Sequence, residues 1–203
     1  MADLEGAPPV IATFDHTDLE DLGGTVKYYF YQSRDSAGTY YLLGKDNPYS
    51  EILGVDTSAS STEWNFDTGA FNTTRVVGGT LTFNMSVHSV GATGGIARVY
   101  IRVLHYDGST ETELGTWASF GIGESNSPYD QTLLGKIEIP NTRFKRGDVL
   151  RVELIFAHDY GAGQKVIDIP TDPQNRDYKS VTPSTDADQF TSSYIMIPFR
   201  IDD

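Results

Sequence analysis

Cysteine is absent from the 203 residues of this chain, and basic residues are scarce. Without cysteine, the chain forms no disulfide bonds, zinc–thiolate sites or thiol nucleophiles. Lys and Arg number 15 against 28 Asp and Glu, which gives a formal net charge of −13. A chain with this charge is repelled by nucleic acid and by anionic membrane surfaces, so we expect neither as a partner.

Long apolar runs and helical periodicity are also missing. No stretch approaches the roughly 20 apolar residues that a membrane-spanning helix needs. The first residues carry Asp3 and Glu5 where a secretory signal peptide needs positive charge, so no such signal is expected. The 38% of apolar residues still suffice for a hydrophobic core.

The first 24 residues have the composition of an extended acidic arm. They contain six acidic residues and no Lys or Arg, and Pro8 and Pro9 favour an extended backbone. Val10, Ile11 and Phe14 form an apolar group that is too small to be a core. We therefore predict that these three residues contact the folded domain or another subunit.

Residues 25–60 are predicted to form an aromatic β-hairpin followed by a loop that packs on the core. The segments VKYYFYQ and TYYLL flank the polar turn SRDSAG, and aromatic residues occupy both faces. Tyrosine is common both at protein interfaces and on sugar-binding platforms. Tyr29, Tyr31 and Tyr40 are accordingly candidate contact residues, while residues 47–61 are predicted to be loop.

Residues 61–203 are predicted to form a β-sandwich. In TLTFNMSV, apolar and polar residues alternate with a period of two, and the same pattern recurs in ARVYIRVLHYD, VLRVELIFA and YIMIPFRI. Roughly eight or nine strands joined by turns, without a helical period, indicate an all-β fold, an antiparallel β-sandwich of the jelly-roll or Greek-key kind. This pattern places Leu81, Phe83, Ile101, Val152 and Phe156 inside.

One segment of the sandwich, residues 161–191, is predicted to be a long loop. It contains Pro170, Pro173 and Pro183, five Asp residues and little periodicity. Connections of this length in a compact domain are uncommon and often bind something, although a plain surface loop explains the composition equally well.

No catalytic, cofactor or metal motif is found. The sequence contains no phosphate-binding loop, no H-E-x-x-H, no Gly-x-Ser-x-Gly and no calcium-binding loop of the EF-hand type. Glu111 and Glu113 stand two apart on one strand, about 7 Å along it, a spacing compatible with paired glycosidase carboxylates. A solvated strand face explains the two residues better than catalysis, so we predict no catalytic residues, cofactor or metal.

Three stretches, AFNTTRVVGGTLTFNMSV, RVYIRVLHYDGSTETELGT and TRFKRGDVLRVELIF, resemble tailed-phage virion proteins of β-sandwich type in the order of their elements. The shared marks are Phe71 followed by Gly78 and Gly79, then Tyr106-Asp107-Gly108, then the strand entry that begins at Phe144. Each is a turn device, because Gly permits positive φ and Asp caps a turn.

The resemblance implies a non-catalytic capsid decoration (cement) protein on the outer head surface of a virion, made in the host cytoplasm. Its implied partners are the major capsid protein and copies of itself, most simply in a trimer, with no nucleic acid and no membrane. The alternatives are a tail or fibre component, a glycan-binding jelly-roll module, and a glycosidase that uses Glu111 and Glu113.

Overall fold

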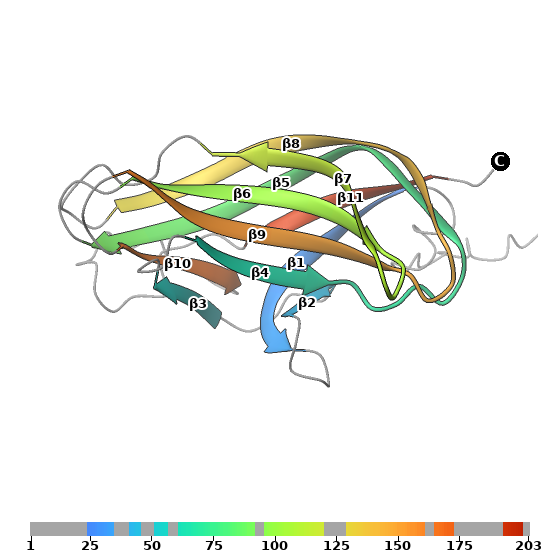
Figure 1. The fold of residues 1–203 in the computed structure, drawn as a ribbon, viewed down its shortest axis with the longest axis horizontal. Coiled ribbons are helices and arrows are strands. Elements are labelled where there is room, and N and C mark those ends of the chain that lie inside the picture. The colour runs from blue at the N-terminus through green and yellow to red at the C-terminus, as the bar shows by residue number, and fades with distance from the viewer. Residues whose placement is uncertain are drawn as a thin grey trace, which may run out of the picture.

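The computed structural model describes residues 24–34, 41–45, 51–56, 61–91, 96–119, 129–160, 165–172 and 193–200. These residues form eleven strands, and no helix among them is long and apolar enough to cross a membrane. The strands, drawn in Figure 1, are β1 (Thr25–Arg34), β2 (Tyr41–Gly44), β3 (Glu51–Asp56), β4 (Ser61–Asp67), β5 (Arg75–Gly91), β6 (Ile96–Tyr106), β7 (Glu111–Ala118), β8 (Tyr129–Phe144), β9 (Val149–Tyr160), β10 (Lys165–Asp172) and β11 (Tyr194–Arg200).

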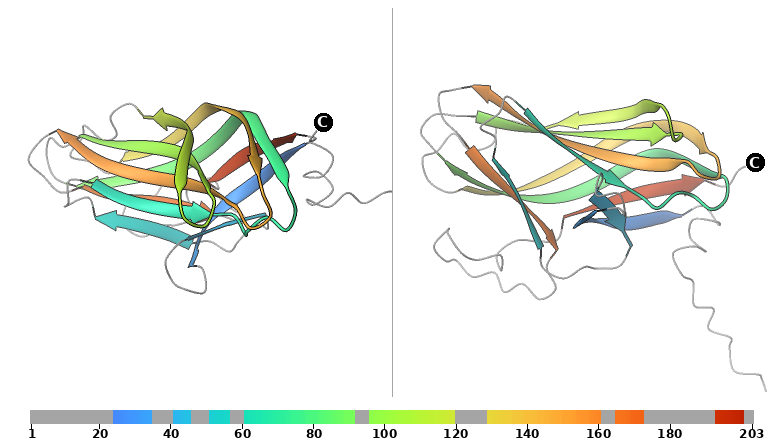
Figure 2. Two further views of the ribbon diagram at one scale, coloured as in Figure 1. Left: turned by 45° about the vertical axis from the view of Figure 1, so that its right-hand side comes forward. Right: turned by 60° about the horizontal axis from the view of Figure 1, so that its bottom comes forward.

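The strands follow one another in a single sheet that folds over a shared core. The order is β3-β10-β5-β11-β1-β2-β4-β9-β6-β7, and β8 pairs with β5. Every pair is antiparallel except β2 with β4, which pair in parallel through Tyr41 with Phe66 and Leu42 with Asp67. This short parallel bridge joins two antiparallel halves, β8-β5-β11-β1-β2 and β4-β9-β6-β7, which face each other (Figure 2).

The sheet almost closes where β7 approaches β8. A Cβ atom placed on Gly115 of β7 would lie 2.9 Å from the carbonyl oxygen of Glu138 on β8, so only a residue without a side chain fits at this point. Nearby, Trp117 of β7 packs edge-on against Phe83 of β5, the strand that pairs with β8, with ring centroids 4.8 Å apart. The prediction of an all-β, mainly antiparallel fold is confirmed, and its two layers nearly form a barrel.

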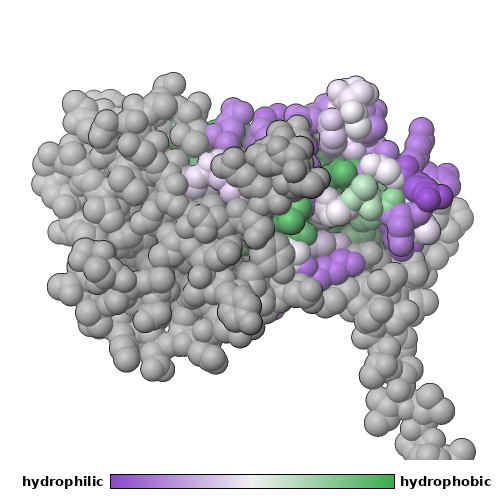
Figure 3. All heavy atoms as spheres, turned by 90° about the horizontal axis from the view of Figure 1, so that it is seen from below, coloured by the Kyte–Doolittle hydropathy of each residue, from purple (hydrophilic) through white to green (hydrophobic). Residues whose placement is uncertain are grey.

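The core consists of the inward-facing residues of both halves, as the alternation predicts. Leu81, Phe83, Ile101, Val152 and Phe156 are each at most 2% exposed. Their neighbours in sequence point outward because successive side chains of a strand alternate between its faces. Among the described residues that are coloured in the view from below, most of the visible surface is hydrophilic and a small area is apolar (Figure 3).

The predicted aromatic hairpin is present as β1 and β2. Phe30 lies opposite Leu43 in the antiparallel pair, and its ring meets that of Phe66 on β4 edge-on, with centroids 5.0 Å apart. Tyr28 and Phe30 are buried in the common core. The inward aromatic face of the hairpin is thus covered by the sandwich itself.

Two predicted loops contain strands. Within residues 47–61 lies β3, and within residues 161–191 lies β10, so the count is eleven rather than eight or nine. The two strands pair with each other, from Val166 opposite Asp56 to Asp172 opposite Glu51, with an irregularity after Pro170. Pro and Gly are depleted in strands, so Pro170 and Gly54 weaken the local signal, and the pairing joins segments far apart in sequence. The remainder of each predicted loop lies outside the described residues.

Candidate functional site

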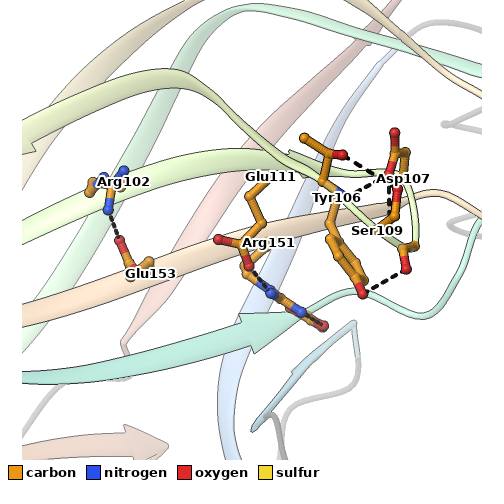
Figure 4. A network of polar contacts seen from close by, with 10 residues as sticks. Arg102, Tyr106, Asp107, Ser109, Glu111, Arg151 and Glu153 are labelled. Atoms are coloured by element: carbon orange, nitrogen blue, oxygen red, sulfur yellow. Dashed lines mark hydrogen bonds and ion pairs between the residues drawn. The ribbon is translucent and has the colours of Figure 1, made fainter.

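Arg151 is the centre of a polar network on the outer face of β4, β9 and β6-β7 (Figure 4). Asp67 accepts hydrogen bonds from Nε at 2.6 Å and from Nη2 at 2.7 Å, and Glu111 accepts one from Nη1. The ring of Tyr106 covers the guanidinium, 4.6 Å from its central carbon. Although β9 directs this side chain away from the core, Arg151 is only 1% exposed. Its charge is therefore buried by polar and aromatic partners, in the forked geometry that suits Arg and carboxylate.

A second arginine of this face, Arg102, bridges two carboxylates. Its Nε donates to Glu113 at 2.8 Å and its Nη1 donates to Glu153 at 2.5 Å. Burial raises the pKa of Glu153 above its ordinary value, the charge of Arg102 works against that rise, and the nearby carboxylate of Glu63 adds to it. Glu153 thus has an environment that disfavours its charged form, with one cation to balance it.

The pair Glu111 and Glu113 is divided between these two arginines. Glu111 binds Arg151, and Glu113 binds Arg102, while both carboxylates remain partly exposed. The structure therefore uses the two residues as ion-pair partners on a strand face. The sequence predicted a solvated strand face here and did not predict the two arginine partners.

An imidazole–carboxylate pair lies at the end of the sandwich. His105 Nε2 is 2.6 Å from Asp148 Oδ2, and the same oxygen accepts a hydrogen bond from the backbone N–H of Lys145. The imidazole ring is 4.3 Å from that of Phe144, which is fully buried. Asp148 thus closes the β8-β9 turn, where Gly147 has a φ of 96°, and ties this turn to β6. Its carboxylate is occupied by that structural role.

The turn between β6 and β7 is built as its sequence predicts. One oxygen of Asp107 accepts hydrogen bonds from the N–H groups of Thr110 and Ser109, at 2.8 and 2.9 Å, and from the Ser109 hydroxyl. Gly108 has a φ of 94°, and the Tyr106 hydroxyl donates to its carbonyl. The N–H of Thr110, followed by the groups of Ser109, lowers the pKa of Asp107 by stabilising its charged form.

The outer face of β1, β11, β5 and β8 has a different character, and we call it the lysine–tyrosine face. One cross-strand row of side chains reads Lys27, Met196, Thr82 and Lys136, taken from β1 to β8. Since neighbouring strands are about 4.8 Å apart, the two lysines at its ends start about 14 Å from each other. The row therefore has a lysine at each end, with Met196 and Thr82 between them.

The adjacent row of the lysine–tyrosine face reads Tyr29, Tyr194, Asn84 and Leu134. The two tyrosine rings meet edge-on with centroids 6.4 Å apart, and Lys27 Nζ lies 4.4 Å from the Tyr194 centroid. Leu134 is 71% exposed, the highest exposure of any large apolar side chain among the described residues. The side-chain oxygen of Asn84 is buried and has no hydrogen-bond partner.

A shallow pocket of about 320 Å³ opens on this face. Its lining is mainly apolar and combines a lysine, a tyrosine and a hydroxyl group with the exposed leucine: Thr82, Phe83, Leu134, Gly135, Lys136 and Tyr194. Gly135 is essential to this arrangement, because a Cβ atom there would collide with the ring of Phe83 and lie 2.9 Å from Trp117 Nε1. The β8 backbone beside the pocket therefore packs directly on the core at Phe83.

Of the contact residues predicted from the sequence, only Tyr29 has a described side chain. It is half-buried and lies on the lysine–tyrosine face. Tyr31 belongs to β1, but its side chain is not described, and Val10, Ile11, Phe14 and Tyr40 lie outside the described residues.

The sequence reasoning missed Lys27, Lys136, Leu134 and Tyr194 as members of one surface. In the sequence, these four residues are recognisable only as outward-facing positions of strands that are far apart along the chain. In the described part of the chain, no group of three or more His, Asp or Glu residues could hold a metal ion.

Comparison with solved structures shows that the fold is shared with parts of larger hydrolases. A CocE/NonD family hydrolase from Staphylococcus aureus matches with a TM-score of 0.52 at 12% identity, over 88% of this chain and 37% of that one. An α-amino acid ester hydrolase matches with a TM-score of 0.52 at 11% identity, over 87% and 36%. An aminopeptidase from the marine sediment archaeon Thaumarchaeota archaeon matches with a TM-score of 0.51 at 9% identity, over 87% and 37%.

The chain thus spans little more than a third of the length of each of these hydrolases. At such low identity, the likeness shows a common fold. No family model matches the chain, and no curated protein matches it either.

These matches contradict the prediction of a virion structural protein, either as a capsid decoration protein or as a tail or fibre component, and they do not point to a glycan-binding module. The three structures described above, each matched at a TM-score above 0.5, are two hydrolases and an aminopeptidase. A structure of infectious bursal disease virus is matched with a TM-score of only 0.28, which gives the resemblance to virion proteins no weight. The marks behind that resemblance, such as Asp107-Gly108 and Gly147-Asp148, build turns. Such turns belong to the β-sandwich whatever its function.

Proposed function

We propose that this chain is a non-catalytic β-sandwich module that binds a protein partner, as an accessory part of a hydrolase assembly. The observation that carries the proposal is that the best catalytic candidates of the described residues are all held in structural contacts. Glu111 and Glu113 are each engaged by a separate arginine, and His105 is paired with a carboxylate that closes a turn. A general acid or base must be within reach of its substrate and able to exchange its proton, and these groups are committed to structural contacts.

The fold comparison supports an accessory role. This chain corresponds to little more than a third of each hydrolase, so the greater part of those enzymes lies outside the shared fold. A module of this kind contributes by packing against or positioning another polypeptide. Function is argued here from the site, since one fold serves many functions.

The proposal is tested by assaying the purified full chain with p-nitrophenyl acetate, an α-amino acid methyl ester and an aminoacyl p-nitroanilide. We expect hydrolysis at the rate of buffer alone and no labelling by a fluorophosphonate probe. Turnover that Glu111→Gln or Glu113→Gln abolishes, or covalent labelling of a single serine, would show that the chain is an enzyme and would refute the proposal.

A further inference from the structure

We propose that the lysine–tyrosine face binds an extended acidic segment of the partner protein, with one apolar side chain of that segment seated in the pocket. This inference rests on the proposed function as a binding module and names the chemistry of its partner. It is carried by the two cross-strand rows that end in Lys27 and Lys136 and in Tyr29 and Leu134.

Charge points to an acidic partner. The chain has a net charge of −13, yet this face carries a lysine at each end of one row, and no described carboxylate lies within ion-pair distance of either lysine. Glu138, two residues along β8 from Lys136, accepts a 2.6 Å hydrogen bond from the Thr80 hydroxyl across the strand pair and forms no ion pair with Lys136. The two lysines attract anionic groups, while the net charge of −13 opposes the approach of a second copy of the whole chain.

The pocket fits an apolar side chain that lies between the two lysines. Leu134 is 71% exposed, and Tyr194 forms the opposite wall, so a buried aliphatic side chain would cover apolar surface that now faces solvent. Lys136 lies on the rim of the same pocket. An aliphatic residue bound here therefore sits beside a cation that can pair with an acidic neighbour.

Distance selects an extended backbone. In an extended chain, residues i and i+4 project from the same side and are about 13 Å apart, close to the span of about 14 Å between the lysine positions. The side chain at i+2 then points to the same face midway between them. The preferred segment is therefore acidic–x–apolar–x–acidic.

The test uses the full chain and a fluorescein-labelled peptide, Gly-Glu-Ser-Leu-Ser-Glu-Gly, in fluorescence anisotropy at low and moderate salt. We expect saturable binding that Lys136→Glu and Leu134→Asp each weaken tenfold or more. The matched control is Lys145→Glu, which reverses an exposed lysine of the β8-β9 turn, and it should bind within twofold of the unchanged chain. A peptide with lysine in place of both glutamates should not bind.

Three outcomes would overturn the inference. The first is no binding of the acidic peptide, and the second is an equal loss in Lys145→Glu and Lys136→Glu. The third is binding that emerges only when the acidic residues of the chain's own first 23 residues are replaced by amides, because that result would make this segment the occupant. Unchanged thermal melting of each variant shows that it is folded. Loss of peptide binding without any hydrolytic turnover would leave the proposed function standing and remove only this partner assignment.

Discussion

At the scale of single residues, the most consequential side chain is Arg151. It is 1% exposed and holds Asp67 and Glu111, so Arg151→Met leaves these carboxylates without their cation. Removing one partner of a buried ion pair costs about 3–5 kcal/mol of unfolding free energy. Urea denaturation followed by tryptophan fluorescence measures the loss. Glu113→Gln is the control, and because that carboxylate is 41% exposed we expect a change of at most about 1 kcal/mol. Equal effects of the two changes would mean that Arg151 has no special role.

Two carboxylates give opposite dependences of stability on pH. The pKa of Glu153 is raised by burial, so its proton stabilises the folded chain below the pKa of the unfolded state, and this contribution is lost as pH rises through the folded pKa. As the pH is raised from about 4 to about 7, the unchanged chain loses this contribution and the Glu153→Gln variant does not. The unfolding free energy of the variant should therefore fall less, or rise more, over this range than that of the unchanged chain.

Asp107 provides the matched case of opposite sign. Hydrogen bonds from Thr110 and Ser109 lower its pKa, so its contribution is present above the unfolded pKa and is lost as pH falls through the folded pKa. Urea titrations at a series of pH values measure both, with Asp107→Asn losing less stability in acid than the unchanged chain. Parallel pH profiles for Glu153→Gln and the unchanged chain would contradict the assignment for Glu153.

At the scale of elements, the contact of β8 with β5 depends on the absence of a side chain at Gly135. Its Cβ would collide with the Phe83 ring and approach Trp117 Nε1 to 2.9 Å, so Gly135→Ala forces either the ring or the strand to move. Overpacking of this kind costs about 1–3 kcal/mol. Thermal melting monitored by circular dichroism measures the cost. A Cβ on Gly69 would meet nothing within 4 Å, so Gly69→Ala should stay within about 0.5 kcal/mol of the unchanged chain. A neutral effect of Gly135→Ala would show that β8 is free to shift there.

At the scale of the whole molecule, the β1-β2 hairpin joins the two halves of the sheet. Phe30 is fully buried against Phe66, and β2 supplies the parallel bridge to β4. We expect Phe30→Ala to destabilise the whole chain by about 3–5 kcal/mol in one cooperative transition. Tryptophan fluorescence and far-ultraviolet circular dichroism should report the same midpoint, because Trp64 and Trp117 lie in the β4-β9-β6-β7 half, whereas circular dichroism reports the strands of both halves. Two separate midpoints would make the hairpin an independent unit.

The sequence by itself determined which residues face the core and how the turns are made. Period-two alternation marks the inward set, such as Leu81 and Val152, because a strand's own geometry assigns each residue to a face. Asp107-Gly108 builds its turn from neighbours within three residues. These features are local, and local sequence specifies them.

Only the tertiary structure decided which strands are neighbours, and with them the sites. Arg151 pairs with Asp67 across 84 positions, and β3 pairs with β10 across a still longer separation. The lysine–tyrosine face brings together Lys27 and Lys136 at opposite ends of one cross-strand row. Alternation identifies the outward positions but gives no information on which strand lies beside which. Strand order follows from packing two apolar faces into one core, and that choice depends on all the strands at once.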